Sequence, residues 1–163
     1  MSASASASAP VEGRVALCVA RFYEELADAL EQGAREALSQ AGVTEVDTHN
    51  VPGAFELPLA AKYAVESGRY VAVVCLGAVI RGETDHYDYV CAETARGISQ
   101  VQLLTGTPVG FGVLTVDTVE QARERVKGGA KRDTGRHAVE AVLATLAIKR
   151  ELTERPRRAG FAV

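Results

Sequence analysis

Four short apolar runs, each followed by a segment with helical periodicity, limit the possible folds of this chain more than any other feature. The runs are Val15–Ala20, Val46–Val51, Tyr70–Cys75 and Val109–Thr115. Three of them are apolar almost throughout, which is typical of strands buried on both faces, whereas 46–51 alternates with polar residues. Because strands that alternate with helices form parallel sheets, the pattern predicts an α/β fold with a four-stranded parallel sheet between helices.

Between the runs, apolar residues recur at intervals of three and four, which indicates helices with one buried face. The expected helices span about residues 26–41, 58–66 and 87–101, followed by a short helix through 125 and a last one to about 154. We expect Asp117 or Thr118 to cap the short helix, with Glu120 as its capping-box partner. Gly42 and Gly68 follow the first two helices, where glycine commonly ends a helix.

The composition fits one globular domain. The 163 residues are 47% hydrophobic and 24% charged, the net charge is −3, and no basic stripe indicates a nucleic-acid surface. No apolar run approaches the roughly 20 residues of a membrane span. We expect a disordered Ser/Ala arm over 1–12, one domain over 13–154 and a loose basic tail over 155–163. Cys18, Cys75 and Cys91 fall in apolar segments, so we interpret them as reduced core residues of a cytoplasmic protein.

Residues suited to a binding site follow the predicted strands. Right-handed crossovers place the carboxyl ends of parallel strands along one edge of the sheet, and ligands bind there. The segments expected at this edge are Phe22, the turn 53–56, the loop 78–86 and the Phe111 region. Four separate segments would therefore converge on one site.

The stretch 76–90 carries most of the candidate chemistry. Gly82 lets the backbone approach a ligand, and Thr84 with the free amides of a first helical turn can hold an anion. Arg81 supplies a cation, and His86 can move a proton near neutral pH. The simpler interpretation of His86 is a histidine at a helix N-terminus without a chemical role.

Other candidates leave alternatives open. Phe22 and Phe111 could stack on a flat heterocycle or could be ordinary packing residues. Glu56 could accept hydrogen bonds from a polyol or could simply favour a helix N-terminus. Four cations could bind an anion, although each of them taken alone is more typical of a solvated surface charge. They are Arg81, Arg125, Lys131 and Arg132. Phosphate-loop and dinucleotide glycine motifs are absent from the sequence, and no spacing resembles a metal site.

Taken together, these segments resemble the 6,7-dimethyl-8-ribityllumazine synthase family. The matching segments are Arg21–Phe22, Val51–Pro58, Leu76–Val90, Pro108–Thr115 and Glu120–Arg125. The resemblance implies a flavodoxin-like three-layer sandwich. It also implies condensation of 5-amino-6-(D-ribitylamino)uracil with 3,4-dihydroxy-2-butanone 4-phosphate, the penultimate step of riboflavin biosynthesis, without a metal or organic cofactor.

The resemblance also implies roles for individual residues. His86 would be the proton donor and acceptor, and Phe22 would stack on the pyrimidine ring. Glu83 and Thr84 would bind the phosphate of the four-carbon substrate, largely through backbone N–H groups. Phe111 and Arg125 would reach the site from a neighbouring subunit, with Arg125 as a phosphate partner. The ring and the ribityl chain would contact Ala54, Phe55, Glu56, Ala78, Val79 and Ile80.

One position departs from the family pattern. Thr134 stands where the resemblance implies a phosphate-binding lysine, and Lys131, Arg132 or Arg136 could substitute for it.

The family assembles as pentamers, sometimes twelve of them in an icosahedral shell, and the short loop 127–131 favours the shell. Thr134 motivates a second hypothesis, a non-catalytic shell-forming or lumazine- or flavin-binding homologue. A third, an unrelated flavodoxin-like regulator or nucleotide binder, is disfavoured because no phosphate loop follows the first strand.

Overall fold

The computed structural model describes residues 9–154, and it confirms an α/β fold with four strands. Parts of the predicted arm (1–8) and the whole predicted tail (155–163) lie outside the described residues. The elements are β1 Val15–Ala20, α1 Glu24–Gln40, β2 Val46–Val51, the 3₁₀ turn η1 Ala54–Glu56, α2 Leu57–Glu66, β3 Ala72–Ile80, α3 His86–Thr105, β4 Val109–Val116, α4 Val119–Glu124 and α5 Thr134–Glu154.

All four strands are parallel, in the spatial order β2-β1-β3-β4. β1 pairs with β2 from Val15 opposite Val46, and with β3 from Val15 opposite Ala72. Every residue of β1 is buried, whereas the edge strand β2 is only half-buried. The apolar runs β1 and β3 are therefore central strands, and the alternating run β2 is an edge. The apolar run β4 is the other edge, where Phe111 and Thr115 are exposed, so the expectation that it is buried on both faces is not met throughout.

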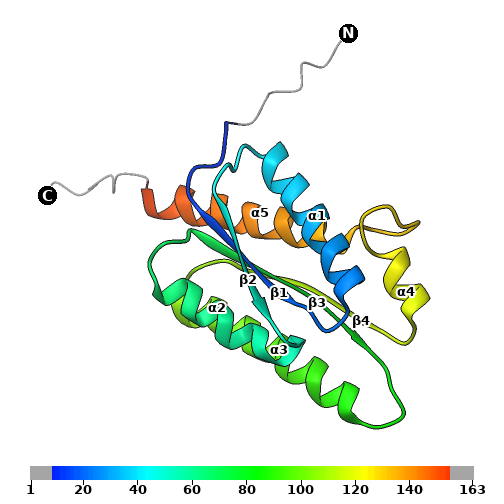
Figure 1. Ribbon diagram of the computed structural model, residues 1–163. Coiled ribbons are helices and arrows are strands. Elements are labelled where there is room, and N and C mark those ends of the chain that lie inside the picture. Colours follow the sequence, from blue (N-terminus) through cyan, green and yellow to red (C-terminus); the bar gives the residue numbers. More distant parts are fainter. Residues whose placement is uncertain (1–8, 155–163) are drawn as a thin grey trace, which may run out of the picture.

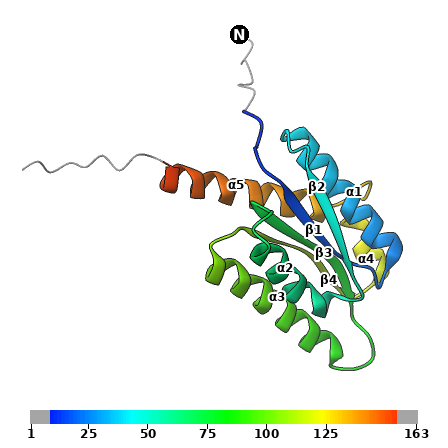
Figure 2. The same ribbon diagram turned by 60° about the vertical axis from the view of Figure 1, so that its left-hand side comes forward.

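Helices cover both faces of the sheet, which gives three layers (Figures 1 and 2). On one face α1 and α5 pack on the strands through residues such as Leu17, Leu30 and Val139. On the other face α2 and α3 pack through Leu57 and Ile98. The inner face of α3 is formed by Thr94, Ile98 and Val101, which are the buried residues of the helix.

The α1–α5 contact depends on two small residues. A Cβ added to Gly135 would collide with the backbone oxygen of Leu30, and one added to Gly33 would lie 2.5 Å from the Asp133 carboxylate. Asp133 precedes α5, where its Oδ1 accepts a hydrogen bond from the Arg136 amide at 3.1 Å. The carboxylate thus satisfies a free amide in the first turn of α5 while lying against α1.

The cap of α4 differs in detail from the prediction. Thr118 is the N-cap, and its Oγ1 accepts from the Gln121 amide at 3.1 Å. The reciprocal contact comes from Gln121, whose Oε1 accepts from the Asp117 amide at 2.8 Å, and not from Glu120. Because Thr118 is the cap, the third helical position falls one residue later than a cap at Asp117 would place it.

Residues 9–12 were predicted to belong to the arm, but two of them contact the domain. Val11, assigned to the arm, donates its amide to the Ala41 oxygen at 3.0 Å and packs against the core. The Glu12 oxygen accepts a hydrogen bond from Arg150 at 2.7 Å. No helix within residues 9–154 combines the length and the apolar character needed to cross a membrane.

Candidate active site

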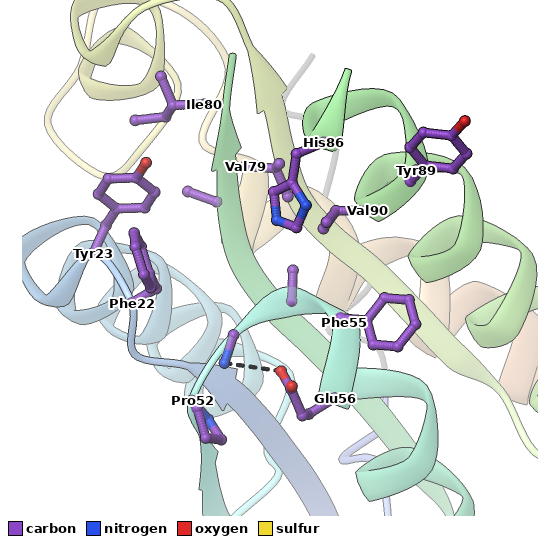
Figure 3. Close-up of a pocket in the computed structure, with 13 residues that line it drawn as sticks. Phe22, Tyr23, Pro52, Phe55, Glu56, Val79, Ile80, His86, Tyr89 and Val90 are labelled. Atoms are coloured by element: carbon purple, nitrogen blue, oxygen red, sulfur yellow. Dashed lines mark hydrogen bonds between the residues drawn. The ribbon is translucent and has the colours of Figure 1, made fainter. Parts of the chain in front are cut away.

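A pocket of about 590 Å³ opens where the carboxyl ends of β1, β2 and β3 meet the segments that follow them (Figure 3). It is mostly apolar and contains a few polar groups, which is typical of sites for small molecules. Seven of the predicted site residues and His86 are among those that form its wall. The lining residues are Phe22, Tyr23, Pro52, Gly53, Ala54, Phe55, Glu56, Ala78, Val79, Ile80, His86, Tyr89 and Val90.

An aromatic pair forms one side of the pocket. Phe22 follows β1 and is 74% exposed, so its ring is free to contact a ligand. The Tyr23 ring meets it edge-on, with centroids 4.9 Å apart and planes at 75°. Figure 3 shows the two rings together, away from Phe55 and Tyr89. This side of the pocket offers a flat apolar surface to a heteroaromatic ring.

The turn after β2 brings a carboxylate to the pocket. Pro52 and Gly53 break the strand, and η1 follows directly. Glu56 turns back so that its Oε2 accepts a hydrogen bond from the Gly53 amide at 3.1 Å (Figure 3). The side chain is exposed, and no other described residue hydrogen-bonds to its Oε1. Glu56 therefore satisfies the turn and still has an acceptor for a hydroxyl group of a ligand.

His86 is the first residue of α3, and its ring points into the pocket (Figure 3). Its backbone N–H lies 3.4 Å from Thr84 Oγ1, and no described residue hydrogen-bonds to its imidazole. Both ring nitrogens are therefore available to a ligand. The structure brings His86, Phe22 and Glu56 together from three separate segments, as the topology argument predicts.

Arg81 is engaged within the protein rather than facing the pocket. Its Nε lies 2.9 Å from Asp117 Oδ1, and a second nitrogen lies 3.5 Å from Asp88. The hydrogen bond to Asp117 raises the pKa of Arg81 above its usual range, so the guanidinium stays charged. The interpretation of Arg81 as a cation for a ligand is not supported by these contacts.

Four predicted site residues do not line the pocket of a single subunit: Glu83, Thr84, Phe111 and Arg125. Glu83 and Thr84 lie on the exposed loop next to His86. Phe111 pairs with Cys75, whereas β4 ends at Val116. The expectation that the Phe111 region lies at the carboxyl edge is therefore wrong within one subunit, because five residues of strand span roughly 17 Å. Arg125 donates a hydrogen bond to the Gln121 oxygen at 2.9 Å, near the end of α4.

The candidate substitutes for the missing lysine differ in their contacts. Arg136 is bound to Gln40 at 2.9 Å and lies 3.5 Å from Glu36, and Arg132 lies 2.9 Å from the His137 ring. Lys131 has no side-chain partner within the described part of the chain. Its amide donates to the Glu124 oxygen at 2.8 Å, which holds it beside the segment that carries Arg125.

Gly53 belongs to the turn that was expected at this edge, but four further lining residues were not predicted as site residues: Tyr23, Pro52, Tyr89 and Val90. Helical spacing could have indicated Tyr89 and Val90, since they follow His86 by three and four residues. Tyr23 was harder to find, because a tyrosine at a helix N-cap position carries no expected role.

Comparisons with known proteins agree with the resemblance. The model of the family described as 6,7-dimethyl-8-ribityllumazine synthase matches residues 12–150. A protein of that name from Kineococcus radiotolerans is 47% identical over 96% of this chain and 99% of its own length. Another from Streptomyces avermitilis is 47% identical over 86% of this chain and 88% of its own length, and one from Desulfosudis oleivorans is 54% identical over 68% and 71%.

Proposed function

This chain belongs to the 6,7-dimethyl-8-ribityllumazine synthase family, transferases of riboflavin biosynthesis, and from that premise we propose a reaction and a site for it. The reaction joins 5-amino-6-(D-ribitylamino)uracil to 3,4-dihydroxy-2-butanone 4-phosphate and releases phosphate and water. The observation that carries the assignment of the site is the convergence of Phe22, Glu56 and His86 on one pocket. The proposed reaction uses neither a metal nor an organic cofactor.

In the proposed complex, the pyrimidine ring lies on the exposed face of Phe22, and the ribityl chain lies along η1. Glu56 accepts hydrogen bonds from the ribityl hydroxyls through the oxygen that Gly53 does not use. Small and apolar side chains leave room for the ring and exclude water from it. They are Ala54, Phe55, Ala78, Val79 and Ile80.

His86 performs the proton transfers. Imine formation, phosphate loss and ring closure each require a proton to be added or removed, and an imidazole can do both near neutral pH. The phosphate lies near Glu83 and Thr84, where the first-turn amides of α3 favour an anion. Much of the remaining acceleration comes from holding the two reactants together.

The site is completed by a second subunit in a homopentamer, alone or within a 60-subunit shell. Phe111 and Arg125, which do not reach the pocket of their own subunit, would serve the pocket of a neighbour. Exposed apolar side chains support assembly, among them Leu103 and Leu104 of α3, which are 79% and 85% exposed. The native particle mass measures the assembly state directly. The proposal also keeps the protein in the cytoplasm, to which its free cysteines are suited.

Lys131 takes the place of the missing lysine. Its ammonium group has no partner among the described side chains, whereas Arg132 and Arg136 are engaged. We expect Lys131→Ala to raise the KM for the four-carbon phosphate and to leave the KM for the pyrimidine unchanged. Lys127→Ala is the control, because that lysine already pairs with Glu36 at 2.5 Å.

The test of the proposed function is a direct assay of the purified protein. Mixing both substrates should produce lumazine fluorescence, and His86→Gln should reduce the rate by roughly 10²-fold or more, since it removes the proton-transfer group. His49→Gln is the matched control, because His49 contacts Tyr70 at 2.9 Å and lies outside the pocket. Absence of product from the unaltered protein would contradict the proposal.

A non-catalytic homologue is the second candidate, and Thr134 is the observation in its favour. Such a protein would bind lumazine or flavin without turnover, and His86→Gln would leave the binding unchanged. Measured binding together with absent turnover would establish this alternative.

A further inference from the structure

Arg81 makes three side-chain contacts from its place between β3 and α3. Its Nε donates a hydrogen bond to Asp117 Oδ1 at 2.9 Å. Another guanidinium nitrogen lies 3.5 Å from Asp88 Oδ1, and the guanidinium carbon lies 4.2 Å from the centre of the Tyr87 ring. The backbone amide of Arg81 also donates to the Val116 oxygen at 2.9 Å. The planar group is therefore held in position as well as in orientation.

These contacts connect two segments that are distant in the sequence. Tyr87 and Asp88 belong to the first turn of α3, directly after His86. Asp117 lies in the turn between β4 and α4, and its own amide donates to Gln121 Oε1 at 2.8 Å. Arg81 thus fixes the start of α3 to the start of α4, and we call this group of contacts the Arg81 clamp.

Besides these contacts, Tyr87 and Val90 pack the first turns of α3 on the core, whereas the loop before the helix adds little support. Asp85 occupies the N-cap position but forms no side-chain cap hydrogen bond. Residues 81–86 are exposed, and the space around Gly82 is open. The contact of the His86 amide with Thr84 Oγ1 is long, at 3.4 Å. The position of the His86 backbone therefore depends on contacts that join the loop to residues outside it, such as those of Arg81 with Asp117 and Tyr87.

We propose that Arg81 is a positioning residue, which holds the first turn of α3 so that His86 faces the pocket at a fixed distance and orientation. The inference rests on the proposed function of the site, but it assigns Arg81 no contact with substrate. A lysine at this position would keep the charge but lose the directional Nε hydrogen bond and the contact of the guanidinium with the face of the Tyr87 ring.

The test compares Arg81→Lys with Arg96→Lys. Arg96 is the matched control, because it is an exposed arginine within α3 whose ion pair, with Glu93 at 3.7 Å, lies away from the pocket. We expect Arg81→Lys to lower kcat by about 10-fold or more, since small misplacements of a catalytic group are costly, and to leave the KM for the pyrimidine within about 2-fold. Arg96→Lys should leave both constants unchanged.

A second readout does not depend on turnover. Hydrogen exchange of the amides over 82–89 should become faster in Arg81→Lys, with an unchanged melting temperature, because exposed ion pairs add little to global stability. Asp117→Asn removes the charged acceptor without altering Arg81, and it should show the same two effects if Arg81→Lys does not fold.

The outcomes distinguish the positioning role of Arg81 from the proposed function of the site. Unaltered kcat and unaltered exchange in Arg81→Lys, or in Asp117→Asn where the lysine variant does not fold, would overturn the clamp. Faster exchange in a protein that makes no lumazine would retain the clamp as a structural device and would contradict the proposed function instead.

Discussion

Thr94 has a buried hydroxyl with no partner among residues 9–154, in contrast to the general pairing of polar groups in protein interiors. It lies on the inner face of α3, two turns after His86, and it is 1% exposed. Its Oγ1 is the buried side-chain atom without a hydrogen bond among the described residues. Desolvation of an unpaired hydroxyl costs free energy that a methyl group of similar size does not.

We therefore expect Thr94→Val to raise the free energy of unfolding by about 1 kcal/mol. Urea denaturation at fixed protein concentration measures the change, since an oligomer makes stability concentration-dependent. Thr145→Val is the control, because the Thr145 hydroxyl already donates to the Ala141 oxygen at 2.7 Å on an exposed face. Destabilisation by Thr94→Val would indicate that the hydroxyl has a partner such as a bound water molecule.

Asp47 makes the stability of the folded state depend on pH in the acid range. Hydrogen bonds from Tyr70 at 2.9 Å and Arg14 at 3.1 Å lower the pKa of the Asp47 carboxyl. A carboxyl with a lowered folded pKa stabilises the protein above its unfolded pKa, which is about 3.9 for aspartate. That contribution disappears as the pH falls through the lower folded pKa.

In Asp47→Asn, the free energy of unfolding should consequently fall less steeply as the pH drops into the acid range. The stability difference between the unaltered protein and the variant should be largest near neutral pH and should shrink as the pH drops below about 4. Denaturant midpoints measured from pH 7 to pH 3 check this. A difference that stays constant across that range would contradict the linkage.

At the scale of elements, the α1–α5 contact leaves no room for added volume at Gly135. We expect Gly135→Ala to destabilise the protein by about 1–3 kcal/mol, because the new Cβ meets the backbone oxygen of Leu30. Gly82→Ala is the control: its Cβ would point into open space, so it should change stability by less than about 0.5 kcal/mol. Equal effects in thermal denaturation would contradict the close packing.

The elements themselves could be predicted because their signals are local. An apolar run such as 15–20 and a helix face such as that of α3 are encoded within a few neighbouring residues. Phe111 shows the limit of this reasoning. Membership of β4 was predictable, but its distance from the carboxyl edge follows from the register with β3 and from the strand length.

The site was predictable in part for the same reason. Parallel topology alone places Phe22, η1 and His86 at one edge of the sheet, and the structure brings them together. The contacts of Arg81 could not be predicted, because Asp117 lies 36 residues away and belongs to another loop. Sequence shows an arginine near a histidine, whereas only coordinates show which acid holds it.

At the scale of the whole molecule, the proposed reaction requires two subunits at every site. The pocket of one subunit contains the aromatic platform, the carboxylate and the imidazole, but Arg125 does not line it. Five residues of β4 likewise separate Phe111 from the carboxyl end of its own strand. A site that lacks its phosphate cation within the subunit has to obtain one from a neighbour if the reaction is to proceed as proposed.

Subunit complementation is the most direct measurement of this claim. His86→Gln and Arg125→Ala proteins should each be nearly inactive in the lumazine assay. After joint dissociation and reassembly, a mixture should regain activity at roughly a quarter of its sites, the random share in a ring of heterologous interfaces where a neighbour supplies the missing group. A mixed oligomer of confirmed mass that stays inactive, or an Arg125→Ala protein that is fully active alone, would contradict the shared site.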